Sequence, residues 1–284
     1  MTPSSDERRG RATVAPLVPE RKPMPTSPAT AARTNPRAAV PTRPLLAFAA
    51  IAVPTGWVLL STAQLLDAPA DPFVLLTLLL GLVLPAVVLL RRDPRTTLRA
   101  TLRDLVRPTR PAWLMAPAAL GIPLVAWLLA AALDGTDGDA TAAVGAFAGA
   151  ALGSLVIVNL WEELAWTGFF QRGAMARWGY LGGSLVTAVL FAAIHLPLAF
   201  DGADGLRDVL VGVAALLGAG VGMRLLIGAL DLWAGSSLLA VAMLHASFNG
   251  AAEIIEPDVD WVRYAVVLVA GVLAAALLGR KDRA

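Results

Sequence analysis

Residues 159–169 read Asn159-Leu-Trp-Glu-Glu-Leu-Ala-Trp-Thr-Gly-Phe169, and they lie inside one of the most apolar parts of the chain. An ionised acid at the centre of a bilayer costs about 2.5–3.5 kcal/mol even on lenient insertion scales. Glu162 and Glu163 are therefore unexpected in a helix that serves only to cross a membrane. Ionisable residues within such helices usually mark a functional centre.

The composition indicates a membrane protein. Of 284 residues, 57% are hydrophobic and only 15% are charged, whereas a soluble domain carries about 25% charged residues. The chain contains no cysteine, which excludes disulfides, thiol nucleophiles and cysteine-based zinc sites. A net charge of +2 is too small to indicate nucleic-acid binding. The predicted fold class is all-α and polytopic, with the lipid bilayer as its surroundings.

Apolar segments long enough to cross a hydrocarbon core about 30 Å thick recur along residues 43–284. Residues 1–42 differ: they are rich in Pro, Arg, Thr and Ser, and we expect a disordered basic tail. The transmembrane domain of residues 43–284 is expected to contain about eight helices. They are predicted at 45–66, 73–90, 112–133, 141–176, 180–200, 209–230, 236–255 and 262–278.

The connections between these segments alternate in charge, which predicts the orientation. Asp and Glu gather at 67–71, 134–139, 201–208 and 256–260, whereas Arg and Lys gather in the tail, at 91–110, at 172–177 and at 280–283. Because basic loops stay in the cytoplasm, both termini are expected there. The bias towards Ala, Arg and Pro is typical of a GC-rich bacterial genome, so we expect a multi-pass protein of a bacterial plasma membrane.

The only two histidines of the chain, His195 and His245, also fall inside predicted membrane helices. Helices four and five should form a hairpin that turns at residues 178–179, with Glu162 and His195 each 16 positions from the turn. Equal arms of an antiparallel hairpin bring the two residues to one level. His245 lies near the middle of helix seven, and Asn249 follows on the same face four residues later. These three groups of polar residues, on helices four, five and seven, are expected to converge.

Such a cluster suits water-activated hydrolysis of a peptide bond. A desolvated glutamate is a competent general base, and histidine and asparagine donors can stabilise the oxyanion of an attacked amide. Imidazole and carboxylate are equally the ligand set of a catalytic zinc ion, so Zn²⁺ held by Glu162, His195 and His245 is a second route. Adjacent glutamates point about 100° apart on a helix, so only one is expected to aim at the common centre.

The three groups of polar residues resemble the signature of the CPBP family, the type II CAAX prenyl endopeptidases and bacteriocin-processing Abi proteins. The family pattern is EExxxR, FxxxH and HxxxN on successive helices. The chain matches it with Glu162-Glu163, Phe191 to His195, and His245 to Asn249. The resemblance covers a core of about 141–255. It implies an intramembrane glutamate protease or metalloprotease that cleaves a hydrophobic, CAAX-like or bacteriocin-like peptide or a membrane protein.

By this resemblance Glu162 would be the general base, acting on water together with His195. His245 and Asn249 would stabilise the oxyanion, and Glu163 would support the site. The chain departs from the pattern at the arginine of EExxxR, which is Thr167 here. Arg224 is a candidate substitute, although we expect its side chain to extend to the membrane interface instead.

Two other functions remain open. Chains of Glu and His also mark proton paths in transporters, although the sequence shows no clear inverted repeat. A catalytically silent relative that binds a peptide toxin is the third hypothesis, because Thr167 departs from the pattern.

Two sets of glycines have the spacing that lets helix backbones approach closely. They are Gly145, Gly149 and Gly153 in the fourth predicted helix, and Gly218 and Gly222 in the sixth.

Overall fold

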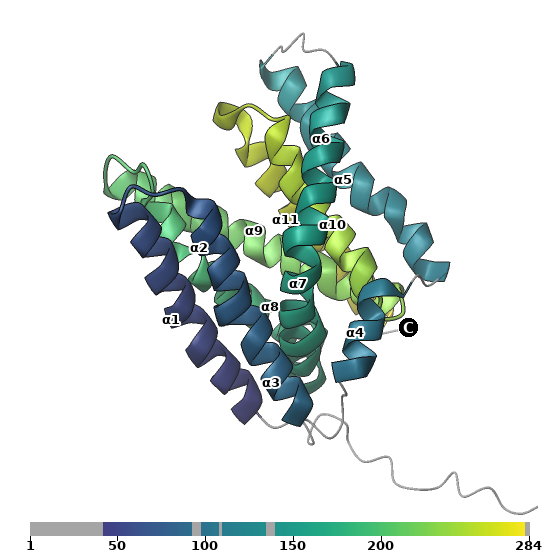
Figure 1. The fold of residues 1–284 in the computed structure, drawn as a ribbon. Helices are drawn as coiled ribbons and strands as arrows, with labels where there is room; N and C mark the ends of the chain where they lie inside the picture. Colours follow the sequence, from purple (N-terminus) through teal and green to yellow (C-terminus); the bar gives the residue numbers. More distant parts are fainter. Residues whose placement is uncertain (1–41, 93–97, 108–109, 135–139, 282–284) are drawn as a thin grey trace, which may run out of the picture. The chain divides into compact units, whose positions relative to one another are not determined.

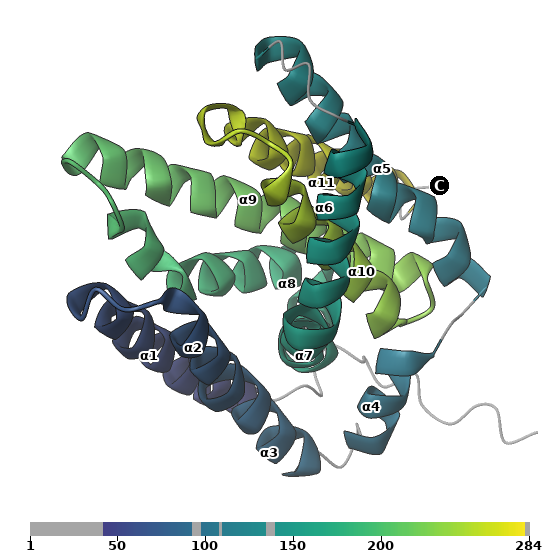
Figure 2. The same cartoon turned by 45° about the horizontal axis from the view of Figure 1, so that its top comes forward.

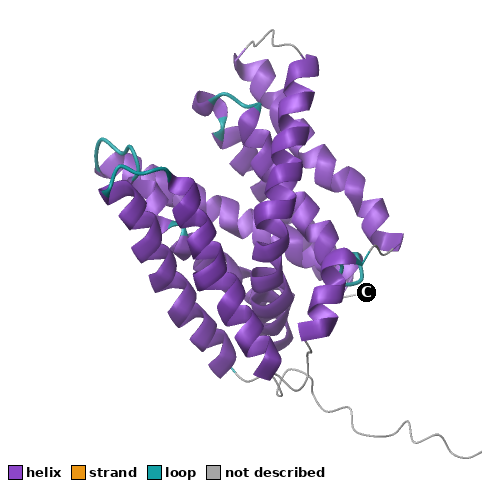
Figure 3. Ribbon diagram, viewed as in Figure 1, coloured by secondary structure: helices purple, strands orange, loops and turns teal. Residues whose placement is uncertain are grey.

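A computed structural model describes residues 42–92, 98–107, 110–134 and 140–281, all of which belong to the unit Asn35–Ala284. Within these ranges the regular structure is entirely helical, without strands (Figure 3). The all-α fold class is thereby confirmed. The predicted disordered tail, residues 1–42, lies almost wholly outside the described residues.

The helices follow the predicted apolar segments closely. The first half of the chain contains α1 (Arg43–Leu65), α2 (Ala70–Leu76), η2 (Thr77–Val83), α3 (Leu84–Arg92), α4 (Leu98–Val106), α5 (Arg110–Asp134), α6 (Ala140–Ser154), η3 (Leu155–Asn159), α7 (Leu160–Glu163) and η4 (Leu164–Gln171). The second half contains α8 (Arg172–Ile194), η5 (Leu196–Phe200), α9 (Leu206–Trp233), α10 (Leu238–Gly250), η6 (Ala251–Glu253), η7 (Pro257–Val259) and α11 (Trp261–Lys281).

Five described helical stretches are long and apolar enough to cross a membrane: 43–65, 70–92, 141–194, 206–233 and 257–278. The third of these holds two predicted segments, because the backbone continues from α6 to α8. Many large apolar side chains on these stretches are exposed, among them Val58, Leu79, Val144 and Leu273. An apolar exterior is what contact with lipid requires, and the protein is therefore a multi-pass membrane protein.

The predicted hairpin turn lies inside α8. Gly179 has φ of 76°, a left-handed conformation that favours glycine, and it breaks the helix where the turn was expected. The helical arms on either side of Gly179 approach closely: a Cβ added to Gly183 would lie 2.3 Å from the backbone nitrogen of Met175. This turn brings the second arm of α8 back towards η4.

The helix that carries His195 ends earlier than predicted. It stops at Ile194, and a 3-10 segment, η5, continues to Phe200. The physical reason is Pro197, which lacks an N–H group and clashes with the preceding turn of an α-helix. The sequence predicted that His195 lies within a helix. In the structure it is instead the C-cap residue of α8.

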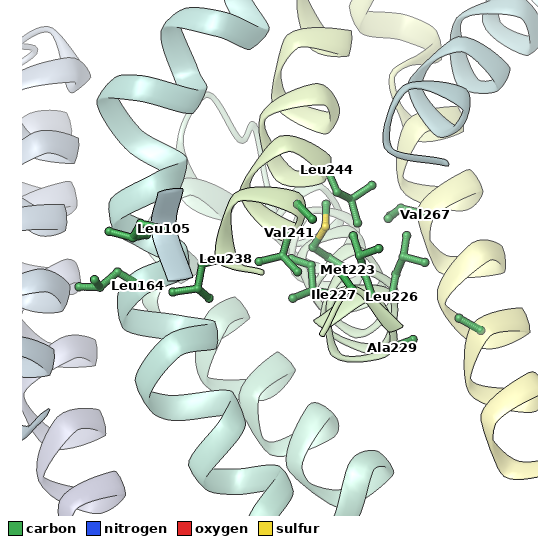
Figure 4. Packing of buried hydrophobic residues seen from close by; sticks show 14 residues of the cluster. Leu105, Leu164, Met223, Leu226, Ile227, Ala229, Leu238, Val241, Leu244 and Val267 are labelled. Carbon is green, nitrogen blue, oxygen red and sulfur yellow. The ribbon is translucent and has the colours of Figure 1, made fainter. Parts of the chain in front are cut away.

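Two apolar clusters hold these helices together. One joins α4, η4, α9, α10 and α11 through side chains such as Leu105, Leu164, Ile227, Leu244 and Val267 (Figure 4). The other packs α1 and α3 against η4 and the end of α8, with aromatic contacts between Phe48 and residues 166–170. Figures 1 and 2 show α1 running beside α2 and α3 in both views.

The two glycine patterns have different outcomes. A Cβ on Gly222 of α9 would lie 2.5 Å from Leu268 Cα of α11, so these helices meet backbone to backbone as predicted. Among the described residues, a Cβ on Gly145, Gly149 or Gly153 would meet nothing within 4 Å. Within that part of the chain, the prediction of close packing is therefore wrong for these three glycines of α6.

Candidate active site

One cavity of about 350 Å³ receives the predicted polar side chains from three separate elements. Glu162 of α7, His195 at the end of α8, and His245 and Asn249 of α10 all line it. Four of the five residues selected from the sequence are thus brought to one place. The rest of the lining is mainly apolar and includes Leu60, Leu78, Leu82, Leu198, Leu216 and Met223.

The fifth residue, Glu163, lies behind the cavity wall in a closed polar cluster. Its side chain is fully buried, and both carboxylate oxygens are engaged. Arg224 donates from Nη2 to Oε1 at 3.0 Å and from Nη1 to Oε2 at 3.1 Å. His245 Nδ1 lies 2.7 Å from Oε1, and the Thr167 hydroxyl donates to Oε2. The geometry makes Glu163 a paired, hydrogen-bonded carboxylate.

Arg224 does not extend to the membrane interface, and that expectation is wrong. Its side chain is completely buried, and its guanidinium carbon lies 4.3 Å from the centre of the Phe191 ring. A guanidinium over an aromatic face is favourable, and the bidentate pair with Glu163 compensates its burial. Arg224 therefore supplies from α9 the positive charge that the family pattern places at position 167.

Glu162 has a more open environment. Its side chain retains 12% exposure, and Oε2 lies 3.7 Å from His245 Nδ1. Asn159 donates from Nδ2 to the same oxygen at 3.3 Å. Both glutamates thus approach His245, but only Glu162 lines the cavity, in agreement with the expectation that one of the pair aims at the centre.

A chain of amide and hydroxyl groups connects Glu162 to Asn249. Asn159 Oδ1 accepts from the Ser154 hydroxyl at 2.6 Å and from Asn249 Nδ2 at 3.4 Å. Asn249 Nδ2 also lies 3.3 Å from Ser154 Oγ. The backbone of η3 and η4 on either side of α7 is π-helical, a rare conformation that occurs frequently at functional sites.

Hydrogen bonds orient both imidazole rings in the same sense. The Nδ1 atom of His195 lies 2.6 Å from the carbonyl oxygen of Phe191, and a carbonyl can only accept. The Nδ1 of His245 faces the paired Glu163 carboxylate. Both rings therefore carry a proton on Nδ1, and Nε2 is the nitrogen left for chemistry.

The predicted metal set does not form as a metal site. Among the described residues, no group of three or more His, Asp or Glu side chains is arranged to hold a metal ion. The oxygen of Glu162 approaches His245 at Nδ1, the nitrogen that already donates to Glu163. The side chains of Glu162, His195 and His245 consequently do not fit Zn²⁺ as a set.

Sequence reasoning missed Asn159, Ser154 and the true role of Arg224. A signal existed for Arg224, because a lone charge in the middle of an apolar helix is a functional candidate by default. Asn159 and Ser154 gave no comparable signal. Small polar residues are common in membrane helices, and nothing in the pattern places them beside Asn249.

Fold and site together define a polytopic helical membrane protein in which carboxylate, imidazole and amide side chains line one cavity. The sequence model of the type II CAAX prenyl endopeptidase Rce1-like family matches residues 144–251. This match confirms the resemblance predicted from the three motifs, over that region of the chain. In general terms it supports a CAAX-type intramembrane endopeptidase. No curated protein matches the chain in a sequence comparison.

Proposed function

We propose that the chain hydrolyses a peptide bond of a hydrophobic substrate with Glu162 as the general base. The observation that carries this proposal is the placement of the Glu162 carboxylate and both imidazole-bearing residues on one cavity. A glutamate that keeps access to a cavity can take a proton from water, which a carboxylate already saturated by donors, such as Glu163, cannot do.

In the proposed reaction Glu162 accepts a proton from water while the resulting hydroxide bonds to the carbonyl carbon. His195 accepts a hydrogen bond from the same water through Nε2 and orients it. Asn249 Nδ2, and His245 Nε2 when that ring is doubly protonated, donate to the oxyanion. The carbon–nitrogen bond then breaks, and Glu162 returns its proton to the leaving amine.

The lining of the cavity favours an apolar substrate. Leucines at 60, 78, 82, 198 and 216, with Met223, surround the polar centre. The volume of about 350 Å³ lies within the range of small-molecule pockets, roughly 300–1,000 Å³. It holds a few residues of a peptide, so we propose a hydrophobic or CAAX-like segment as substrate. The family match favours this function over a transporter or a silent peptide-binding protein.

Purified protein in detergent or liposomes tests the proposal with a hydrophobic or prenylated peptide. We expect cleavage by the wild type and a loss of roughly 10²–10⁴-fold in kcat/KM for Glu162→Gln, the range that general acid–base catalysis contributes. Cleavage should persist in the presence of a chelator. Wild-type turnover by a folded Glu162→Gln variant would contradict the proposal, and chelator-sensitive turnover would replace it with a metal mechanism.

We also propose that the protein lies in a bacterial plasma membrane with both termini in the cytoplasm. The charge alternation of the loops supports this orientation. Since the chain has no cysteine, single variants can report it directly. A membrane-impermeant maleimide added outside the cell should label Ala68→Cys but not Arg177→Cys, and the reverse pattern would invert the orientation.

A further inference from the structure

Thr77 differs from the other buried hydroxyls of the membrane helices. Thr187 donates to Gly183 O at 2.7 Å and Ser247 to Met243 O at 2.7 Å, each satisfying its hydroxyl on its own helix. Thr77 is only 7% exposed, yet its hydroxyl finds no hydrogen-bond partner among the described residues. A buried polar group without a partner carries a free-energy penalty.

The position of Thr77 gives this hydroxyl a use. Thr77 lines the same cavity as Glu162, His195 and His245. It is the first residue of η2, a π-helical segment that contacts α7, on which Glu162 lies. The neighbouring lining residues are apolar, namely Val74 of α2 and Leu78 and Leu82 of η2. Thr77 is thus a single polar group on an otherwise apolar wall of the cavity.

We propose that the Thr77 hydroxyl binds the peptide substrate by donating a hydrogen bond to one of its backbone carbonyl oxygens. An extended peptide in an apolar cavity carries carbonyl groups that water cannot reach, so each needs a donor. Thr77 supplies one and gains its own partner at the same moment. The inference rests on the proposed function, and it assigns a substrate-binding role to a helix outside residues 144–251.

The test uses an isosteric pair of variants. Thr77→Val replaces the hydroxyl by a methyl group of similar size, and Thr77→Ser keeps the hydroxyl. We expect Thr77→Val to lower kcat/KM for a hydrophobic peptide roughly three- to tenfold, the worth of one hydrogen bond, and Thr77→Ser to remain within about twofold of the wild type. In a Glu162→Gln background, Thr77→Val should weaken binding of the fluorescently labelled peptide by the same factor.

Thermal unfolding separates this role from a structural one. Because the hydroxyl has no partner among the residues that the structure describes, Thr77→Val should leave the midpoint unchanged or raise it. The control Thr187→Val removes an internal hydrogen bond of an equally buried threonine, so it should lower the midpoint without changing peptide affinity. A lowered midpoint with unchanged affinity for Thr77→Val, or equal losses for Val and Ser, would overturn the inference.

Failure of the proposed function gives a different result. A wild type that neither cleaves nor binds the peptide, or a Glu162→Gln variant with normal turnover, removes the proposed function, and the inference falls with it. An inactive Glu162→Gln variant beside a fully active, tightly binding Thr77→Val variant removes the inference alone.

Discussion

Glu162 and Glu163 are neighbours in the chain, yet the structure places their carboxylates in opposite surroundings. Glu163 is fully buried and accepts hydrogen bonds from Arg224, His245 and Thr167. Glu162 lines a cavity and, among the described residues, accepts a hydrogen bond from the amide of Asn159. Both lie near the same imidazole, at 2.7 and 3.7 Å from His245 Nδ1.

The difference shows how one acidic pair can serve two purposes. A carboxylate saturated by charged donors is held in one protonation state and one position, which suits it to orient His245. A carboxylate with open coordination can accept and return a proton. The pair thus separates positioning from proposed proton transfer by a single step along the chain.

Replacement of Glu163, the fully buried carboxylate, should have the largest effect on the free energy of unfolding. Glu163→Leu leaves Arg224 buried without its bidentate partner, and we expect a loss of about 3–5 kcal/mol in the free energy of unfolding. The double variant Glu163→Leu/Arg224→Met should recover most of that loss, because an apolar pair of similar volume often replaces a buried ion pair without cost.

Equilibrium unfolding in mild detergent measures these changes, with Glu162→Leu as the matched control. We expect the control to change stability far less, since it leaves no buried cation unpaired. Equal destabilisation by the two leucine substitutions would erase the distinction between the carboxylates.

A second arginine should compete with the first. Thr167→Arg restores the residue of the family pattern, but position 167 is fully buried here and Arg224 already pairs with Glu163. Overpacking alone should cost roughly 1–3 kcal/mol. Combining Thr167→Arg with Arg224→Met should relieve the competition in the same unfolding assay, and no relief would mean that the two positions do not substitute for one another.

The side-chain amide of Asn159 should support the role of Glu162, the carboxylate that lines the cavity. Asn159→Ala removes the donor to Glu162 and the acceptor for Ser154 and Asn249. We expect kcat to fall about tenfold, the equivalent of one buried hydrogen bond of ~1.4 kcal/mol. Peptide-cleavage kinetics provide the measurement. Ser247→Ala, whose hydroxyl donates only within α10, is the control, and an equal loss in that variant would argue against a specific role for Asn159.

The smallest effect is expected for Thr167→Val. This change removes one of several donors to Glu163 and preserves shape, so it should lower the free energy of unfolding by ~0.5–1.5 kcal/mol and leave cleavage within about twofold. A large loss of activity in a stable Thr167→Val protein would show that the closed cluster does more than hold His245.

The sequence predicted the helices and the convergence of four polar residues because both depend on local pattern. The length of the apolar segments predicts where the helices lie, and equal spacing from the turn at residues 178–179 matches Glu162 with His195. The pairing of Arg224 with Glu163 joins residues 61 positions apart, and no local spacing encodes it. The early end of α8 at Ile194 could have been predicted from Pro197.

The glycine patterns illustrate the same limit. Gly145, Gly149 and Gly153 have the same four-residue spacing as Gly218 and Gly222, yet only Gly222 meets a neighbouring backbone closely. Spacing shows that a helix can be approached closely. Which helix packs against these glycines depends on the arrangement of all the helices.

Carboxyl labelling tests the division between the two glutamates most directly. An apolar carbodiimide, dicyclohexylcarbodiimide, can enter the cavity from the membrane, and mass spectrometry identifies the modified residue. We expect modification of Glu162 with a parallel loss of cleavage, while Glu163 stays unmodified behind Arg224. Modification of Glu163 in the folded protein, or loss of cleavage with Glu162 unmodified, would contradict that division.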